Sequence, residues 1–258
     1  MSLARLELKS VSKRFGELEV LDDISLSVSR GEFVSILGPS GAGKSTILQL
    51  LTGALRHDRG EILCDGAPLE SNSHRFAFMP QRDALMPWRR IIDNATLGLE
   101  VQGMTRAAAR EKVQPLIAEF GLAGFERHYP SQLSGGMRQR VALLRTVVQQ
   151  RSMLLLDEPF GALDALTRAR MQRWLSGMWT HHNWTVLLIT HDVREAVLLS
   201  DRIYVLSPRP ARILRHYDIS LSHPRPPAGD PMLSAIEADI LQTLLTLEER
   251  PCRTFVPL

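Results

Sequence analysis

The sequence is poor in cysteine and has no long apolar run, and each absence excludes a class of protein. Only Cys64 and Cys252 are cysteines among 258 residues, and neither has a CxxC or Cys/His spacing. A disulfide framework or a zinc site is therefore not expected, and a reducing compartment is favoured. No uninterrupted apolar run approaches the roughly 18 residues that span a bilayer. The N-terminal MSLARLELKS lacks an apolar signal core, so we expect a soluble protein that could still sit on a membrane protein.

A strong excess of charge is also missing. The net charge is +3, although the isoelectric point is near 9.1, and no basic stripe is evident. A nucleic-acid partner is therefore not expected. Internal repeats and low-complexity tracts are absent too. The chain is long enough to bury a proper core, and its length falls between one large domain and two small ones.

Strand signals occur in both halves of the chain and enclose a helical segment. Short apolar runs predict strands at 3–8, 18–28, 32–37, 153–156, 185–189 and 202–206. Between about 87 and 148 the pattern is helical, and Pro115 predicts a kink or break in a helix from Thr105 to Gly121. The proline-rich stretch 222–230 is expected to be a linker. A final amphipathic helix is predicted from Ile236, Ile240, Leu244 and Leu247.

The clearest motif is GPSGAGKST, which lies between a predicted strand and a predicted helix. It consists of Gly38, Pro39, Ser40, Gly41, Ala42, Gly43, Lys44, Ser45 and Thr46. The spacing G-x-x-x-x-G-K-[ST] is that of a P-loop, whose backbone N–H groups wrap a phosphate chain at a helix N-terminus. Lys44 would hold the β- and γ-phosphates, and Ser45 would offer its hydroxyl to Mg²⁺. A tight turn without a ligand is the alternative, which the strand–loop–helix context disfavours.

Polar residues follow three other predicted strands. MLLLDE ends in Asp157, which suits a Mg²⁺ carboxylate, and Glu158, which is placed to polarise an attacking water. Gln81 follows RFAFMP and could reach a metal or water, and His191 follows TVLLIT and could contact a γ-phosphate. Alone, each is more often a solvated turn or a structural residue. Together with the P-loop they predict a nucleotide-hydrolysing site.

A second glycine-rich helix start lies almost a hundred residues later, in LSGGMRQR. Ser134 is a natural N-cap, and Gly135 and Gly136 leave the first helical N–H groups uncovered. This pattern predicts a second anion site, although a capped helix start without a ligand is the more common meaning of such a triplet.

These motifs carry a family resemblance. GPSGAGKST, Gln81, LSGGMRQR, LLLDEP, GALD (Gly161 to Asp164) and His191 have the order and spacing of an ATP-binding cassette. The sequence resembles the nucleotide-binding subunit of an ABC transporter over roughly residues 3–215. The resemblance implies an α/β P-loop NTPase core with a mixed sheet, an antiparallel N-terminal β subdomain and an inserted helical subdomain. It places the ATP-binding domain at 3–221 and a linker with a C-terminal helix at 222–258.

The resemblance also implies roles for single residues. Phe15 stands where an aromatic ring stacks on adenine, Ser45 and Gln81 bind Mg²⁺, and Asp157 supports the metal. Glu158 is the general base and His191 senses the γ-phosphate. Ser134, Gly135 and Gly136 form the family signature, and Asp164 lies in a loop that links two sites across a dimer. Two departures, Gly161 and the segment LLRT at 143–146, put no catalytic residue in doubt.

Segments 83–103, 158–168 and 206–213 resemble the importer branch for nitrate, sulfonates and taurine, whose relatives also take up thiamine pyrimidine precursors. This implies permease subunits, a solute-binding protein reached through them, a second copy of the ATPase, and a place on the cytoplasmic face of the inner membrane. Leu85, Met86 and Trp88 are expected either to form the groove for a permease helix or to pack in the insert's own core. A soluble ABC ATPase or a regulatory cassette is the alternative function. It is disfavoured because the chain has one cassette and keeps its catalytic residues.

Overall fold

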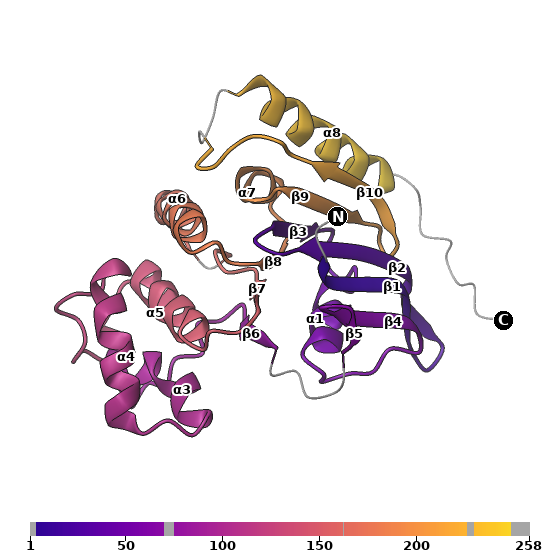
Figure 1. The fold of residues 1–258 in the computed structure, drawn as a ribbon. Coiled ribbons are helices and arrows are strands. Elements are labelled where there is room, and N and C mark those ends of the chain that lie inside the picture. The colour runs from indigo at the N-terminus through magenta and orange to yellow at the C-terminus, as the bar shows by residue number, and fades with distance from the viewer. Residues whose placement is uncertain (1–3, 70–74, 162, 226–229, 249–258) are drawn as a thin grey trace.

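Two sheets form the framework of the molecule (Figure 1). The computed structural model describes residues 4–69, 75–161, 163–225 and 230–248. The antiparallel sheet has the order β2 (Leu18–Ser29), β1 (Ala4–Phe15), β4 (Arg59–Cys64) and β5 (Ala67–Pro68). The larger sheet has the order β10 (Ile213–Asp218), β9 (Arg202–Leu206), β3 (Phe33–Leu37), β8 (Val186–Thr190), β7 (Met153–Asp157) and β6 (Phe76–Met79). Its strands run parallel except β10, so the predicted mixed α/β architecture is confirmed.

The central parallel strands divide the core because successive side chains point to opposite faces. In β3, Phe33 joins a cluster with the helices of the insert, whereas Val34 joins a second cluster with the antiparallel sheet. All five residues of β3 and of β8 are buried. Burial on both faces explains why these strands read as continuous apolar runs in the sequence.

Helix α1 (Lys44–Leu51) belongs to the second cluster, through Ile47, Leu48, Leu50 and Leu51. The insert contains α2 (Ile91–Ala95), α3 (Leu97–Val101), α4 (Arg106–Glu119), a 3₁₀ turn (Pro130–Gln132) and α5 (Gly135–Val147), and it packs on α6 (Ala165–His182). Helix α4 is continuous through Pro115, so the break that the sequence allowed does not occur. Pro115 and Glu111 are exposed, so water can donate to the Glu111 carbonyl that the proline leaves unpaired.

The C-terminal helix packs against its own domain. Helices α7 (Val193–Leu199) and α8 (Pro231–Glu248) share a third cluster, in which Ile240 is fully buried and Ile236 and Leu244 are partly buried. Asp239 of α8 accepts hydrogen bonds from Arg215 and Tyr217 of β10. The side chain of Leu247 lies outside the described residues.

The start of the expected linker is anchored to the core. Arg225 is 3% exposed and donates to the backbone carbonyls of Val197, Ser200 and Ile219. His223 stacks edge-on against Trp179, with ring centroids 4.6 Å apart. Residues 226–229 lie outside the described part of the chain. Proline content alone did not indicate these buried contacts.

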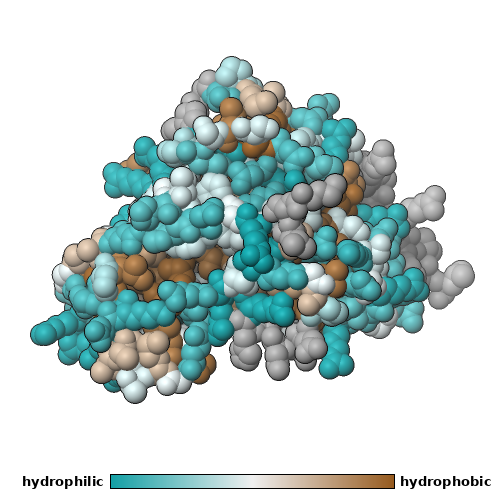
Figure 2. All heavy atoms as spheres, viewed as in Figure 1, coloured by the Kyte–Doolittle hydropathy of each residue, from teal (hydrophilic) through white to brown (hydrophobic). Residues whose placement is uncertain are grey.

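Within the described residues, no helix is both long and apolar enough to cross a membrane. The face shown in Figure 2 is largely hydrophilic, and apolar side chains show mainly over the insert at lower left.

Candidate nucleotide-binding site

The parallel strands bring distant motifs to one edge of the sheet. The P-loop follows β3, Gln81 follows β6, Asp157 and Glu158 end β7, and His191 follows β8. Because the carboxyl ends of parallel strands share an edge, these residues are neighbours although more than 150 positions separate the first from the last.

The P-loop is held open by glycines that no other residue could replace without strain. Gly41 and Gly43 have φ angles of +79° and +89°. A Cβ on Gly43 would stand 2.8 Å from Cδ2 of Leu21, and one on Gly38 would stand 3.1 Å from Cβ of Leu206. Glycine is therefore required both for the backbone conformation and for close packing against β2 and β9. The result is a concave backbone at the N-terminus of α1, which suits a phosphate chain.

Lys44 is the buried cation of this cradle. It is 7% exposed, and its Nζ donates to the carbonyls of Gly38 at 2.7 Å and Pro39 at 2.9 Å. Burial lowers the pKa of Lys44, and the nearby carboxylates of Glu158 and Asp157 act in the opposite direction. Burial raises the pKa of Asp157, and the adjacent Glu158 raises it further. These shifts show that the site gathers charge in a partly dehydrated space.

Glu158 is the residue on which two other predicted site residues converge. Nε2 of Gln81 donates to Oε2 of Glu158 at 2.9 Å, and Nδ1 of His191 lies 3.1 Å from Oε1. The backbone of Glu158 has φ +42°, and its N–H donates to the carbonyl of Ile189 on β8 at 2.8 Å. A left-handed conformation is uncommon for a non-glycine residue. It turns the chain at the end of β7 and directs the carboxylate toward Gln81 and His191.

A cavity of about 390 Å³ lies over the P-loop. Its walls are the P-loop residues Ser40, Gly41 and Gly43 to Thr46, together with Phe15, Leu18, Val20, Glu158 and Arg209. Phe15 is 44% exposed, so its ring is available to a ligand. Leu18, Val20 and Arg209 are lining residues that motif spacing missed. The alternation of β2 hints at the first two, whereas the position of Arg209 depends on the strand order.

The second glycine-rich loop lies elsewhere. Oγ of Ser134 accepts a hydrogen bond from the backbone N–H of Met137 at 3.3 Å, so the predicted N-cap of α5 is confirmed. A Cβ on Gly136 would lie 2.8 Å from Cγ2 of Thr167, at the start of α6. None of Ser134, Gly135 and Gly136 lines the cavity over the P-loop, and α5 and α1 lie in separate parts of the molecule (Figure 1).

Asp164 likewise does not line the cavity and is the N-cap of α6. Its Oδ1 accepts from the N–H of Thr167 at 3.0 Å, and this hydrogen bond lowers the pKa of the Asp164 carboxyl. Asp164 and the Ser134 loop therefore flank the same contact between α5 and α6.

Glu195 is a buried acid that the motifs did not indicate. It is 3% exposed, and its Oε2 accepts from Oγ1 of Thr190, the last residue of β8. Burial raises the pKa of Glu195 to about 8. The contact holds the end of β8 immediately before His191.

Comparison with known proteins agrees with this geometry. The profile of the ABC transporter family matches residues 21–161, and curated relatives more than 40% identical cover almost the whole chain. The chain belongs to the ABC transporter family. Its cassette binds and hydrolyses ATP. The motif-based recognition is thus confirmed.

Among the relatives, the aliphatic sulfonates import ATP-binding protein SsuB 2 of Pseudomonas aeruginosa is 45% identical over 95% of this chain and 86% of that protein. The taurine import ATP-binding protein TauB of Burkholderia pseudomallei is 44% identical over 90% of each chain. Among solved structures, cbiO1 from Clostridium perfringens has a TM-score of 0.75 at 23% identity, over 83% of this chain and 88% of that chain. A bacterial ABC transporter cassette solved as a dimer has a TM-score of 0.70 at 30% identity, over 83% and 98%.

Proposed function

We propose that this ABC ATPase powers the import of a small organic anion of the sulfonate class, through permease subunits at the cytoplasmic face of the inner membrane. The convergence of Gln81 and His191 on Glu158 beside the P-loop supports the ATPase role. The cargo class rests on the relatives named for aliphatic sulfonate and taurine import. Nitrate and thiamine precursors are the alternatives that an uptake assay would separate.

The residues present fit ATP with Mg²⁺. The P-loop supplies backbone donors and Lys44 for the phosphates, and Phe15 supplies a ring face for the adenine. Ser45, Gln81 and Asp157 supply a hydroxyl, an amide and a carboxylate oxygen, which are the donors that Mg²⁺ prefers. When bound, Mg²⁺ would neutralise charge on the phosphates. The hydrogen bond from Gln81 to Glu158 uses the amide N–H and leaves Oε1 of Gln81 available to the metal.

Glu158 is the proposed general base. Its carboxylate is oriented from both sides by Gln81 and His191, so little reorganisation is needed when it accepts a proton from the attacking water. The His191 side chain is 57% exposed, and Nδ1 contacts Glu158. The other ring nitrogen, Nε2, is therefore left to contact the γ-phosphate.

The Ser134 loop is proposed to complete the site of a second subunit. It offers N–H donors at the start of α5 but stands apart from the cavity of its own chain. A head-to-tail homodimer would place Ser134, Gly135 and Gly136 of one subunit against the nucleotide of the other, with Asp164 at the same junction. A cassette 29% identical to this chain was solved as a dimer in a post-hydrolysis state with ADP and phosphate, which supports dimerisation.

The decisive test uses Glu158→Gln. This variant should lose ATP turnover by at least about 100-fold but form an ATP-dependent dimer, measured by sedimentation with ATP and Mg²⁺. ADP in place of ATP is the control and should leave the protein monomeric. A variant that stays monomeric with ATP and Mg²⁺ would contradict the composite site.

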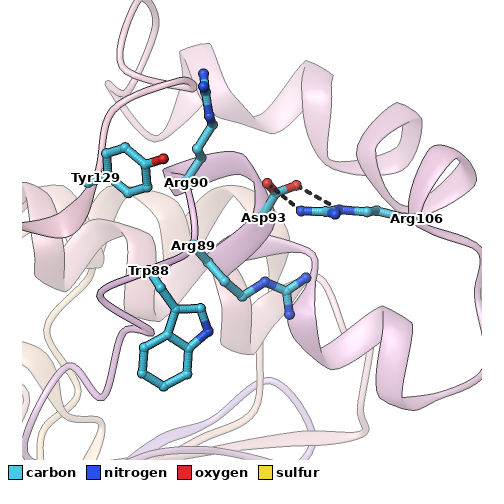
Figure 3. Close-up of a pocket in the computed structure, with 6 residues that line it drawn as sticks. All are labelled: Trp88, Arg89, Arg90, Asp93, Arg106 and Tyr129. Atoms are coloured by element: carbon cyan, nitrogen blue, oxygen red, sulfur yellow. Dashed lines mark hydrogen bonds and ion pairs between the residues drawn. The ribbon is translucent and has the colours of Figure 1, made fainter.

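A cavity of about 500 Å³ on the insert is proposed to receive a cytoplasmic helix of the permease (Figure 3). Of the residues considered from sequence, Leu85 is buried in the core, whereas Trp88 is 73% exposed and lines this cavity. Arg89, Arg90 and Arg106 surround it, and Asp93 is held by Arg106 and Arg110. Arg89 is paired with Glu100, so among the described residues Arg90 is the lining arginine without a carboxylate partner. An exposed indole beside this guanidinium group fits an amphipathic segment with an acidic residue.

Trp88→Ala should reduce uptake in the assembled transporter by about tenfold or more, as hot-spot truncations do. ATPase activity of the isolated subunit should stay within about twofold of wild type, because Trp88 does not line the P-loop cavity. Val101→Ala removes another exposed apolar side chain outside the cavity and serves as the control. A comparable loss of folding stability in Trp88→Ala would favour a core role instead.

A further inference from the structure

The loop between β9 and β10 places an arginine in the nucleotide cavity. Arg209 lines this cavity with Lys44 and the P-loop glycines. Its Nη2 lies 3.0 Å, and its Cζ 3.8 Å, from the position that a Cβ on Gly41 would occupy. The guanidinium group therefore lies directly against the phosphate cradle, in space that is left open because residue 41 is a glycine.

The loop that carries Arg209 is fixed at both ends. Ala211 donates to the carbonyl of Val20 at 2.9 Å, and the N–H of Asp22 donates to the carbonyl of Ala211 at 2.9 Å. Ser207 closes the loop, because its Oγ accepts from the N–H of Arg212 at 2.9 Å. Arg209 is also flanked by two prolines, whose rings restrict the backbone. The loop that carries the Arg209 guanidinium group is thus held by backbone hydrogen bonds to β2, and residues of β2 also line the cavity.

The charge of Arg209 is uncompensated among the residues that the structure describes. In the described part of the chain it has no carboxylate partner and no hydrogen bond, whereas Arg212 of the same loop is paired with Asp22. The other charged groups that line the cavity are Lys44 and Glu158. An unpaired guanidinium group beside a phosphate cradle is suited to a polyanion, because its planar donors match phosphate oxygens.

We propose that Arg209 donates hydrogen bonds to the terminal phosphates of the bound nucleotide and acts as a second cation beside Lys44. It would favour nucleoside di- and triphosphates over monophosphates. This inference rests on the proposed nucleotide site and adds to it a contact from outside the cassette motifs.

The test is the affinity of the full-length protein for ATP, ADP and AMP, measured by calorimetry under monomeric conditions at two salt concentrations. Arg209→Ala should weaken ATP and ADP binding about three- to tenfold, as expected for a partly exposed charge-assisted contact. AMP binding should change less than about twofold, and Arg209→Lys should retain only part of the affinity, because it keeps the charge but loses the planar donors. The loss should shrink at high salt. Arg56→Ala removes an exposed arginine beyond the other end of α1 and is the matched control.

Three results would overturn the inference. They are ATP affinity of Arg209→Ala within about twofold of wild type, an equal loss for ATP, ADP and AMP, and unchanged affinity with loss only of the ATP-dependent dimer. The last result would mean that Arg209 contacts the partner subunit and not the nucleotide of its own chain. Lys44→Ala separates this inference from the site itself. If Lys44→Ala also binds ATP normally, the proposed phosphate site is wrong. If Lys44→Ala loses affinity and Arg209→Ala does not, the site stands and only the proposed role of Arg209 is wrong.

Discussion

The two glycine-rich helix starts of this chain, at α1 and at α5, share a sequence pattern but differ in what surrounds them. At α1 the N-cap is Gly43 in a left-handed conformation, and no side chain caps the helix. At α5 the side chain of Ser134 caps its own helix. The first start has the buried Lys44 and a cavity of about 390 Å³, and the second lines no part of that cavity.

The nearby cations differ as well. Among the described residues, Lys44 donates only to backbone carbonyls of its own loop, so its charge is available to a ligand. Near α5, Arg138 is paired with Asp83 at 3.0 Å and also donates to the carbonyl of Leu133. A glycine-rich helix start is thus combined with an uncapped helix and an available cation at α1, but with a capped helix and a paired cation at α5. This difference fits our proposal that the Ser134 loop contacts a nucleotide held by another subunit.

The largest expected effect is on ATP affinity, which should differ between variants of the two glycine-rich loops. Lys44→Ala should reduce ATP affinity and turnover by about 100-fold or more, because it removes the buried cation of the cradle. Ser134→Ala should leave ATP affinity of the monomer unchanged but lower turnover, at a cost of about 1 kcal/mol in helix capping. Calorimetry and phosphate release measure the two quantities. Loss of monomer affinity in Ser134→Ala would contradict the comparison.

Mixing two inactive variants tests whether the loops serve different chains. In a heterodimer of Lys44→Ala with Ser134→Arg, one composite site carries both changes and the other carries neither. The mixture should therefore recover about a quarter of wild-type turnover if the sites act independently and subunits pair at random. Each variant alone is the control. A mixture as inactive as its components would place both loops at one chain's nucleotide, or require two intact sites for turnover.

The glycines of the two loops should also differ in their effect on stability. Gly43→Ala should destabilise by about 2–3 kcal/mol, because φ is +89° and Leu21 is 2.8 Å from the added Cβ. In Gly136→Ala the added Cβ would be crowded by Cγ2 of Thr167 at 2.8 Å and would contact Cγ of Met171 at 3.9 Å, so the change should cost about 1 kcal/mol. Gly177→Ala, in an open position of α6, should be neutral or slightly stabilising. Denaturant unfolding gives the order, and an equal cost for the first two would contradict it.

The smallest expected effect is the pH dependence of stability that comes from Glu195, which contacts the end of β8 just before His191. Since the pKa of Glu195 is raised to about 8 in the folded protein from 4.5 in its ordinary state, the neutral acid stabilises the fold fully below about pH 4.5. That contribution is lost as pH rises through about 8. The stability of the wild type, measured by thermal unfolding, should therefore fall more steeply between about pH 5 and 8 than that of Glu195→Gln, by about 1 kcal/mol. Parallel pH profiles would show that Glu195 does not titrate in this way.

Much of the fold was predictable because its signals are local. The buried strands β3, β7 and β8 read as apolar runs, and Ser134 is the helix cap that was expected. Short or polar strands were not predicted. The two residues of β5 and the exposed β10 carry little apolar pattern and exist through pairing with β4 and β9. Likewise, α4 continues through Pro115 because Pro115 and Glu111 are exposed, so water can replace the lost hydrogen bond.

By itself, the sequence determined the chemistry of this protein. A P-loop, two acids after a buried strand and a signature loop are short-range patterns, and their combination is typical of ATP hydrolysis. Tertiary structure alone decided which residues meet. Strand order places Arg209 against Gly41 and joins Gln81 and His191 to Glu158, and packing leaves Trp88 exposed while Leu85 is buried. Such contacts depend on how strands far apart in the chain pair, and no local pattern of residues encodes that pairing.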